Sequence, residues 1–340
     1  MKKVVVLMVL LLCWITVTPS WSWAAASPAA VAEPGAEEAS TPEAGQGQPP
    51  EESACPSTFG PLITETAVPA EKGSFAIQPL FQMGFVTDSL TPNWRRESAG
   101  GNFKQFYGEV KMTYGLWDNL EVFAVVPYIH NWAGDVNVPG PKGERSANSG
   151  GIGDVSLTWK YQLVKETETI PTVTLQFTTD FPTGRYRRPN PARLGTDVIG
   201  GGSYVFTTGF DLSKCLKPFV LYANVWYSMG TAYSQRGEDE NGIGLDQRIY
   251  PRDVVTVNLA AEYIITPKWI ALFEVLSSYG TGRLFGQKAN VPPEALISVL
   301  PGIEYMHSEK LGFALGVQVD VLGKNTEAAV TPLCSLVYQF

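Results

Sequence analysis

Histidine and cysteine are both scarce in this chain of 340 residues, which contains two histidines and four cysteines. A catalytic nucleophile needs a base nearby, and neither His130 nor His307 stands in a recognisable catalytic motif. Cysteine, histidine and carboxylate residues also lack the spacing of a zinc site or a calcium-binding loop. We therefore do not expect an enzyme, a cofactor or a bound metal ion.

Long apolar runs and an excess of positive charge are missing as well. Beyond the N-terminal region, no run of about 18 apolar residues occurs, so no helix is expected to cross a membrane. Lysine and arginine total 25, against 33 aspartates and glutamates, and the net charge is −8. A nucleic-acid-binding domain usually carries a basic face, so a nucleic-acid partner is not expected.

The N-terminal region predicts export from the cytoplasm. Two lysines precede an apolar run at 4–17, and small residues follow at 24–26. This arrangement is typical of a cleaved signal peptide, so we assign 1–26 to the signal. Residues 27–61 are rich in Pro, Ala and Glu, a composition that predicts a disordered periplasmic linker. Six glutamates in 27–54 and two lysines in the signal leave about −4 of the net −8 for the rest.

From residue 74 onward the sequence alternates between apolar and polar residues in segments of strand length. In 155–163, for example, Val155, Leu157 and Trp159 share one face, opposite Ser156 and Thr158. A period of two predicts β-strands. We expect twelve strands, at 74–86, 102–114, 119–130, 152–163, 171–182, 198–210, 218–229, 253–264, 268–279, 294–306, 310–321 and 328–340.

The connections between these strands fall into two classes. Short turns alternate with long polar loops at 87–101, 131–151, 183–197, 230–252 and 280–293. Outer-membrane barrels have short periplasmic turns and longer extracellular loops. An even number of strands places both termini on the short-turn side. We therefore predict an all-β fold, a transmembrane antiparallel up-and-down barrel over 62–340, in the outer membrane of a Gram-negative bacterium with both termini periplasmic.

Aromatic residues support this prediction because they collect at one end of the strands. Every even-numbered strand ends on its apolar face with an aromatic side chain: Tyr114, Tyr161, Phe210, Tyr263, Tyr305 and the pair Tyr338 and Phe340. Trp269 and Phe219 follow short turns at the same level. Such a girdle marks a membrane interface. The terminal Tyr338 and Phe340 also resemble the signal by which outer-membrane proteins are recognised by the barrel-assembly machinery.

Three segments of the chain resemble a known family. They are YGLWDNLEVFAVVPY (114–128), GIGDVSLTWKYQL (151–163) and DFPTG (180–184). They are similar to recurring segments of a family of bacterial outer-membrane β-barrel transporters named for the meta-cleavage pathway of phenol degradation. The resemblance covers about 62–340. It implies a transporter in the outer membrane and does not identify the solute.

The strand faces opposite the apolar ones define the expected lumen. Eight carboxylates and two lysines lie there, with aromatic residues that include Tyr107, Tyr222 and Trp226. The charged residues are Glu109, Lys111, Glu121, Asp154, Lys160, Asp180, Glu262, Glu274, Glu304 and Asp320. If the lumen conducts, this acidity favours cations or neutral solutes over anions. The same residues would instead plug the barrel if they formed buried ion pairs and hydrogen bonds, and the sequence leaves both possibilities open.

Residues outside the lumen give two further hypotheses. Arginines cluster in the long loops, notably Arg185, Arg187, Arg188 and Arg193. Guanidinium groups pair well with phosphate, so lipopolysaccharide is one candidate partner, and anionic solutes are another. Cys55 and Cys215 both fall on the expected periplasmic side, where a disulfide between them would be stable.

Three classes of function are consistent with these observations. The first is a channel for small solutes, among them aromatic or apolar compounds, through a narrow acidic lumen. The second is a closed structural or surface barrel that binds lipopolysaccharide or cell wall. The third is a lipid-active hydrolase that uses His130, whose position in its strand points it toward lipid. The expected partners are outer-membrane lipid, the assembly machinery and a small solute.

Overall fold

The computed structural model describes residues 58–238, 244–284 and 286–340. The predicted signal, most of the predicted linker and Cys55 lie outside these residues. Among the described residues, no helix is long and apolar enough to cross a membrane.

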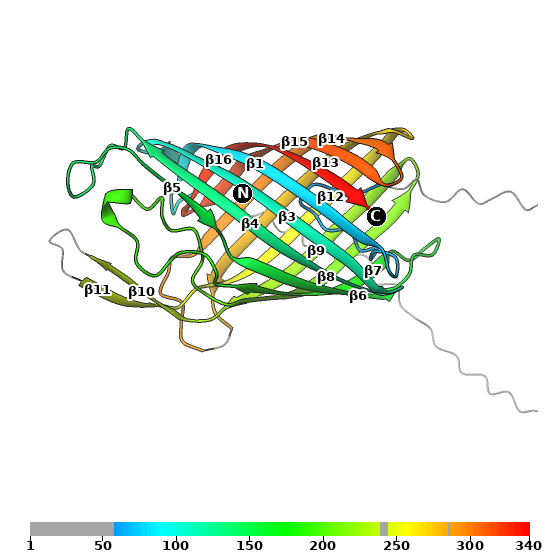
Figure 1. Ribbon diagram of the computed structural model, residues 1–340, viewed down its shortest axis with the longest axis horizontal. Helices are drawn as coiled ribbons and strands as arrows, with labels where there is room; N and C mark the ends of the chain where they lie inside the picture. The colour runs from blue at the N-terminus through cyan, green and yellow to red at the C-terminus, as the bar shows by residue number, and fades with distance from the viewer. Residues whose placement is uncertain (1–57, 239–243, 285) are drawn as a thin grey trace, which may run out of the picture. The chain divides into compact units, whose positions relative to one another are not determined.

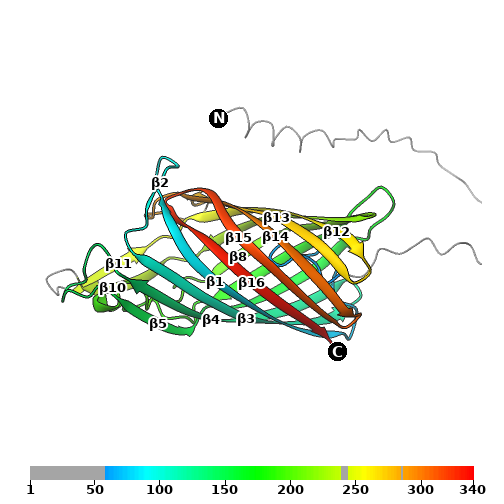
Figure 2. The same ribbon diagram turned by 90° about the horizontal axis from the view of Figure 1, so that it is seen from above.

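Twelve antiparallel strands close into a barrel, as the sequence predicted (Figure 1). They are β1 (Phe75–Leu90), β3 (Asn102–Trp117), β4 (Leu120–Gly134), β6 (Val155–Val164), β7 (Thr172–Phe181), β8 (Val205–Leu216), β9 (Phe219–Gly230), β12 (Asp253–Thr266), β13 (Trp269–Gly282), β14 (Glu294–Ser308), β15 (Leu311–Lys324) and β16 (Thr326–Gln339). Each strand pairs with the next, and β16 pairs with β1. Both ribbon views show the red β16 beside the blue-cyan β1 (Figure 2). No strand edge of the barrel wall is left unpaired, as the hydrocarbon of a membrane requires.

The long loops carry additional short elements. These are β2 (Arg96–Ser98), β5 (Ala147–Ile152), the hairpin of β10 (Tyr233–Glu238) and β11 (Gly244–Ile249), and the 3-10 helix η1 (Pro191–Arg193). The elements β5, β10 and β11 lie at the end of the barrel opposite the C-terminus (Figure 1). The turn between β15 and β16 is a single residue, Asn325, with a positive φ of 53°. Asparagine tolerates this left-handed conformation better than most residues do.

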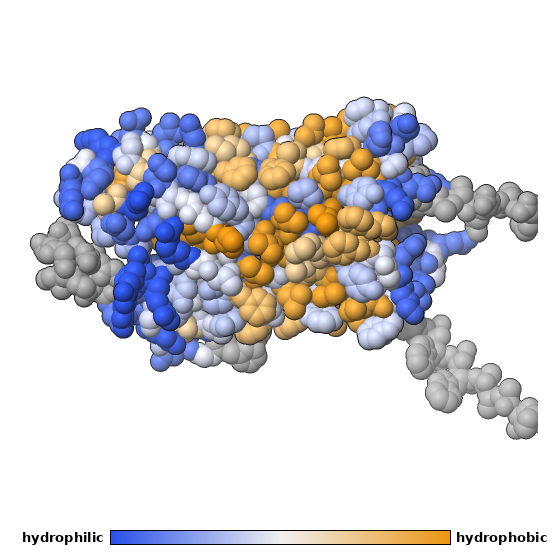
Figure 3. Space-filling view, viewed as in Figure 1, coloured by the Kyte–Doolittle hydropathy of each residue, from blue (hydrophilic) through white to orange (hydrophobic). Residues whose placement is uncertain are grey.

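The outer wall is apolar. Side chains such as Phe81, Trp159, Phe177, Phe273 and Leu315 are each more than 40% exposed on this face. Figure 3 shows apolar residues across the middle of the visible face of the barrel, with hydrophilic residues at both ends. Burying such a band in lipid removes it from water, which a soluble barrel of this composition could not do.

The predicted strand 198–210 is wrong in position, because β8 runs from Val205 to Leu216. Its predicted first residues include Gly200 and Gly202, which lie in the preceding loop, where Gly202 has a positive φ of 73°. At the other end the strand continues through Asp211 and Ser213, whose polar side chains face the lumen. Cys215 therefore lies near the end of β8, and Phe210 lies within this strand and not, as predicted, at its end.

Candidate functional site in the barrel lumen

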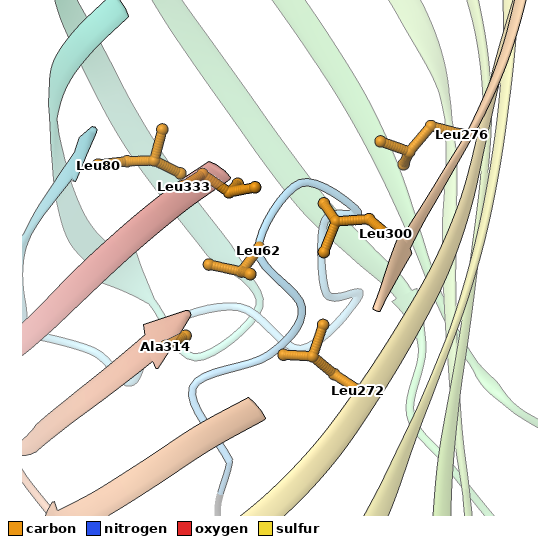
Figure 4. Packing of buried hydrophobic residues seen from close by; sticks show 7 residues of the cluster. All are labelled: Leu62, Leu80, Leu272, Leu276, Leu300, Ala314 and Leu333. Atoms are coloured by element: carbon orange, nitrogen blue, oxygen red, sulfur yellow. The ribbon is translucent and has the colours of Figure 1, made fainter. Parts of the chain in front are cut away.

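A chain segment that precedes the first strand occupies the lumen. Residues 58–70, which we call the plug, bond to side chains on the inner faces of strands all around the barrel. Leu62 packs among Leu80, Leu272, Leu300 and Leu333, which come from four different strands (Figure 4). The predicted boundary between linker and barrel, at 61 and 62, falls within this plug, because Phe59 already donates a hydrogen bond to Glu304 of β14 (3.0 Å).

Glu274 on β13 holds the middle of the plug. Its carboxylate is fully buried and accepts the backbone N–H groups of Leu62 (2.8 Å), Ile63 (3.2 Å) and Thr64 (2.7 Å). The Thr64 hydroxyl adds a fourth donor at 2.6 Å. Several donors directed at one carboxylate stabilise its charge without a cation. In the part of the chain that the structure describes, no lysine or arginine forms an ion pair with Glu274.

Glu65 attaches the plug to the wall on the side of the lumen opposite Glu274. Its carboxylate pairs with Lys111 of β3 (2.7 Å) and Lys160 of β6 (3.5 Å). Burial by itself raises the pKa of Glu65, but the two ammonium groups outweigh it and lower the pKa to about 2. Lys160 is fully buried and also lies 3.4 Å from Glu121 and 3.8 Å from Asp211. The cluster thus joins the plug to β3, β4, β6 and β8 by charge.

Several further backbone groups of the plug bond to side chains of the wall. Asn224 of β9 accepts the N–H of Glu65 (2.9 Å) and donates to its carbonyl (2.9 Å), as a neighbouring peptide would. Ser213 accepts the N–H of Ala67 at 2.8 Å. Buried backbone groups need such partners, and the wall supplies them because its own backbone is already used in the strand ladder.

Small residues on β15 make room for the plug. A Cβ atom added to Gly312 would collide with the ring of Phe59, and one added to Gly316 would lie 2.7 Å from Leu62. Any larger side chain at these positions would occupy the space of the plug. The inner face of β15 therefore matches the plug in shape.

Two further carboxylates lie near the first plug residues. Glu262 accepts the hydroxyl of Tyr222 (2.8 Å), and Glu304 accepts the N–H of Phe59. Each has a second oxygen that is buried and has no hydrogen-bond partner. Removing water from a carboxylate without replacing its hydrogen-bond partners is costly. The negative charges of Glu262 and Glu304 are therefore destabilised by their burial.

A cavity of about 350 Å³ remains between the plug and the wall of β1 and β3. Leu62, Ile63 and Leu80 form its apolar side, and Glu109 and Gln105 belong to its polar side. The lumen is therefore narrowed by the plug and not completely filled.

The other residues predicted for the lumen lie toward the loop end or in the wall. Asp154 follows β5 and accepts the backbone N–H groups of Gly184 (2.8 Å) and Gly201 (2.7 Å), so it ties two parts of one long loop together. Asp180 is on the inner face of β7. Asp320 accepts the Ser298 hydroxyl (2.6 Å) and belongs to a hydrogen-bond network within the wall.

The arginine cluster divides into two kinds of side chain. Arg185 donates to the carbonyl of Asp197 (3.0 Å) and to the Ser149 hydroxyl (2.8 Å), and Arg193 donates to the carbonyl of Asn148 (2.9 Å). Both connect the β7–β8 loop to the β5 region. Arg187 and Arg188 are exposed, so their guanidinium groups are available to solvent.

Tyr338 and Phe340 lie where the barrel closes. The Phe340 N–H donates to the carbonyl of Phe75 (2.9 Å), and its ring lies 5.4 Å from that of Phe75. The rings of Tyr338 and Phe340 are 4.8 Å apart, and both side chains are exposed on the outer face. The end of the chain thus contributes to the contact between β16 and β1.

The histidines and cysteines form no catalytic or metal site among the described residues. His130 stacks on Trp132 with ring centroids 4.2 Å apart, and its Nε2 atom is buried without a hydrogen-bond partner. No group of three or more potential metal ligands gathers anywhere in the described ranges. Cys215 is disulfide-bonded, whereas Cys334 is free. The predicted partner of Cys215, Cys55, lies outside the described residues.

Sequence reasoning missed the plug, the role of Glu65 within it and three wall side chains around it. Glu65 was assigned to the barrel without a role, and Asp211, Ser213 and Asn224 were not singled out. Asp211 and Ser213 were missed because the predicted strand ended at residue 210, before both of them. The signal that was available is the row Gly312, Ala314 and Gly316 on the inner face of β15, because three small residues in a row leave space for another part of the chain.

Comparison with known proteins identifies one family and several solved structures with a similar fold. Residues 87–330 match the family described as "Putative MetA-pathway of phenol degradation". No curated protein matches the sequence. Among solved structures, an outer-membrane channel from Pseudomonas putida F1 is 13% identical, with a TM-score of 0.65, over 83% of this chain and 100% of that one. The translocator domain of the autotransporter NalP from Neisseria meningitidis is 12% identical, with a TM-score of 0.45, over 80% of this chain and 90% of that one.

Proposed function

Because the chain belongs to the family described as "Putative MetA-pathway of phenol degradation", we propose that it is an outer-membrane channel for small solutes, aromatic compounds among them. The Pseudomonas putida F1 protein that shares its fold is an outer-membrane channel. The plug, held in the acidic lumen, sets the width of the path.

The observation that carries this proposal is how the plug is attached. It is held by side-chain hydrogen bonds and ion pairs and by leucine packing, and not as an additional strand of the sheet. A hydrogen bond to a charged carboxylate contributes about 1.5–3 kcal/mol net, and none of these bonds belongs to the strand ladder, so the plug can shift locally while the wall stays intact. The cavity of about 350 Å³ beside it supports a path between plug and wall.

The charge of the lumen determines which solutes pass. Inner-face carboxylates outnumber the two lysines, and both lysines are already paired. A path with this charge attracts cations and admits neutral solutes, and it repels anions.

The orientation and contacts of the barrel belong to the same proposal. Both termini face the periplasm, and the assembly machinery recognises the terminal Tyr338 and Phe340. The exposed Arg187 and Arg188 contact lipopolysaccharide phosphate. Cys215 bonds to Cys55 and thereby ties the segment before the plug to the barrel rim. Peptide mapping without reduction tests this bond, and recovery of Cys55 as a free thiol would exclude it.

The plug also favours a second function, a closed structural barrel that contacts lipopolysaccharide or cell wall. Planar-bilayer recording separates the two. The channel predicts a steady, cation-selective conductance of the refolded barrel, and Glu109→Gln should reduce this selectivity. A folded barrel that stays silent, even when the plug is loosened by Glu274→Ala, would support the structural role and refute the channel.

A further inference from the structure

The cavity beside the plug has an unusual balance of hydrogen-bonding groups. The donors around it are largely engaged. Lys111 is held by both oxygens of Glu65 (2.7 and 2.9 Å), and the Tyr107 hydroxyl donates to Glu109 Oε2 (2.6 Å). The side-chain amide groups of Gln78 and Gln105 donate to Ser335 (3.1 Å) and Asn131 (2.8 Å).

The acceptors remain available. Only Oε2 of Glu109 accepts a hydrogen bond among the described contacts, which leaves Oε1 for a ligand. The amide oxygens of Gln78 and Gln105 accept no described hydrogen bond either. The cavity therefore presents a carboxylate and two amide carbonyls, together with the side-chain amide of Gln82, which forms no described hydrogen bond.

The opposite side of the cavity is apolar. Leu62 and Ile63 of the plug and Leu80 of β1 lie there, and Leu80 is almost completely buried. An apolar cavity of about 150 Å³ is large enough for benzene. The volume of about 350 Å³ therefore holds one six-membered ring with its substituents.

We propose that this cavity binds small uncharged solutes that carry hydroxyl groups on a compact apolar body, and that Glu109 is the residue that selects them. The ring lies against Leu62, Ile63 and Leu80, and a hydroxyl donates to Glu109. A carboxylated ring is repelled by the Glu109 charge, and an unsubstituted ring leaves the acceptors without a donor. This assignment rests on the proposed channel function and specifies its solute class.

The test is calorimetric binding to the full-chain barrel, refolded in detergent, of three compounds with the same ring: catechol, benzoate and toluene. Catechol should bind at least about tenfold more tightly than the other two, because a hydrogen bond to a charged group contributes about 1.5–3 kcal/mol. Glu109→Gln should weaken catechol binding about tenfold and strengthen that of benzoate. Glu309→Gln removes the same charge from an exposed turn between β14 and β15 and should change neither.

A second variant tests the same cavity in case the Glu109→Gln barrel does not fold. Gln82→Trp places a large side chain in the same cavity and should abolish binding of catechol. Equal affinity for catechol and benzoate, or unchanged catechol affinity in both cavity variants, would overturn the assignment. Conductance without catechol binding would also overturn it and leave the channel standing. Catechol binding that depends on Glu109 in a barrel without conductance would retain the site and refute the channel.

Discussion

Replacing Glu274 by alanine is expected to release the plug while the barrel wall remains folded. The variant removes the acceptor of three backbone N–H groups and one hydroxyl, all within 3.2 Å of its carboxylate. A buried donor left without a partner costs about 1–3 kcal/mol. The three buried donors are the N–H groups of Leu62 and Thr64 and the Thr64 hydroxyl. Losing their acceptor weakens plug docking by at least about 3 kcal/mol, which corresponds to more than a hundredfold shift toward the released state.

Hydrogen exchange measured by mass spectrometry tests this expectation directly. Amides of residues 62–64 should exchange at least about a hundredfold faster in Glu274→Ala, while those of the barrel strands keep their protection. Conductance should increase in the same variant. Glu309→Ala is the control, because it removes a glutamate side chain from the exposed turn between β14 and β15. Unchanged protection of residues 62–64 in Glu274→Ala would refute the role assigned to this carboxylate.

Three further predictions concern the charge cluster, the fit of the plug and the closure of the barrel. Because the pKa of Glu65 is lowered from 4.5 to about 2, its stabilisation of the plug, about 3 kcal/mol, is complete above pH 4.5 and is lost as the pH falls toward 2. Conductance should rise over this range, and Glu65→Gln, which has no such charge to lose, should abolish the change. Gly316→Leu should displace Leu62 and speed exchange of the plug amides, whereas Gly282→Leu at the end of β13, where an added Cβ atom would meet open space, should leave that exchange unaltered. Removal of Phe340 eliminates a hydrogen bond and a ring contact with Phe75, worth together about 1–3 kcal/mol. The yield of heat-modifiable barrel in outer-membrane fractions should then fall, and an undiminished yield would exclude a role for this residue in closure or assembly.

The sequence predicted the barrel well because its signals are local. Alternation of side chains decides which face of a strand meets lipid, and Val155, Leu157 and Trp159 show this within one segment. Turn lengths and terminal aromatic residues then indicate strand number and closure. The one misplaced strand is β8. Its lumen face continues through Asp211 and Ser213, where the alternation of apolar and polar residues is weaker, so the predicted strand ended too early.

The occupant of the lumen was decided only by the tertiary structure. Residues 58–70 have no periodic pattern, because their backbone groups bond to side chains that lie up to 245 positions away in the chain, as between Phe59 and Glu304. The local sequence of neither partner in such a contact identifies the other. Alternation alone placed Glu274 and Lys160 inside the barrel. That Glu274 binds backbone, that Lys160 binds three carboxylates and that Glu109 faces the cavity depended on where the plug lies, since each partner comes from a distant part of the chain.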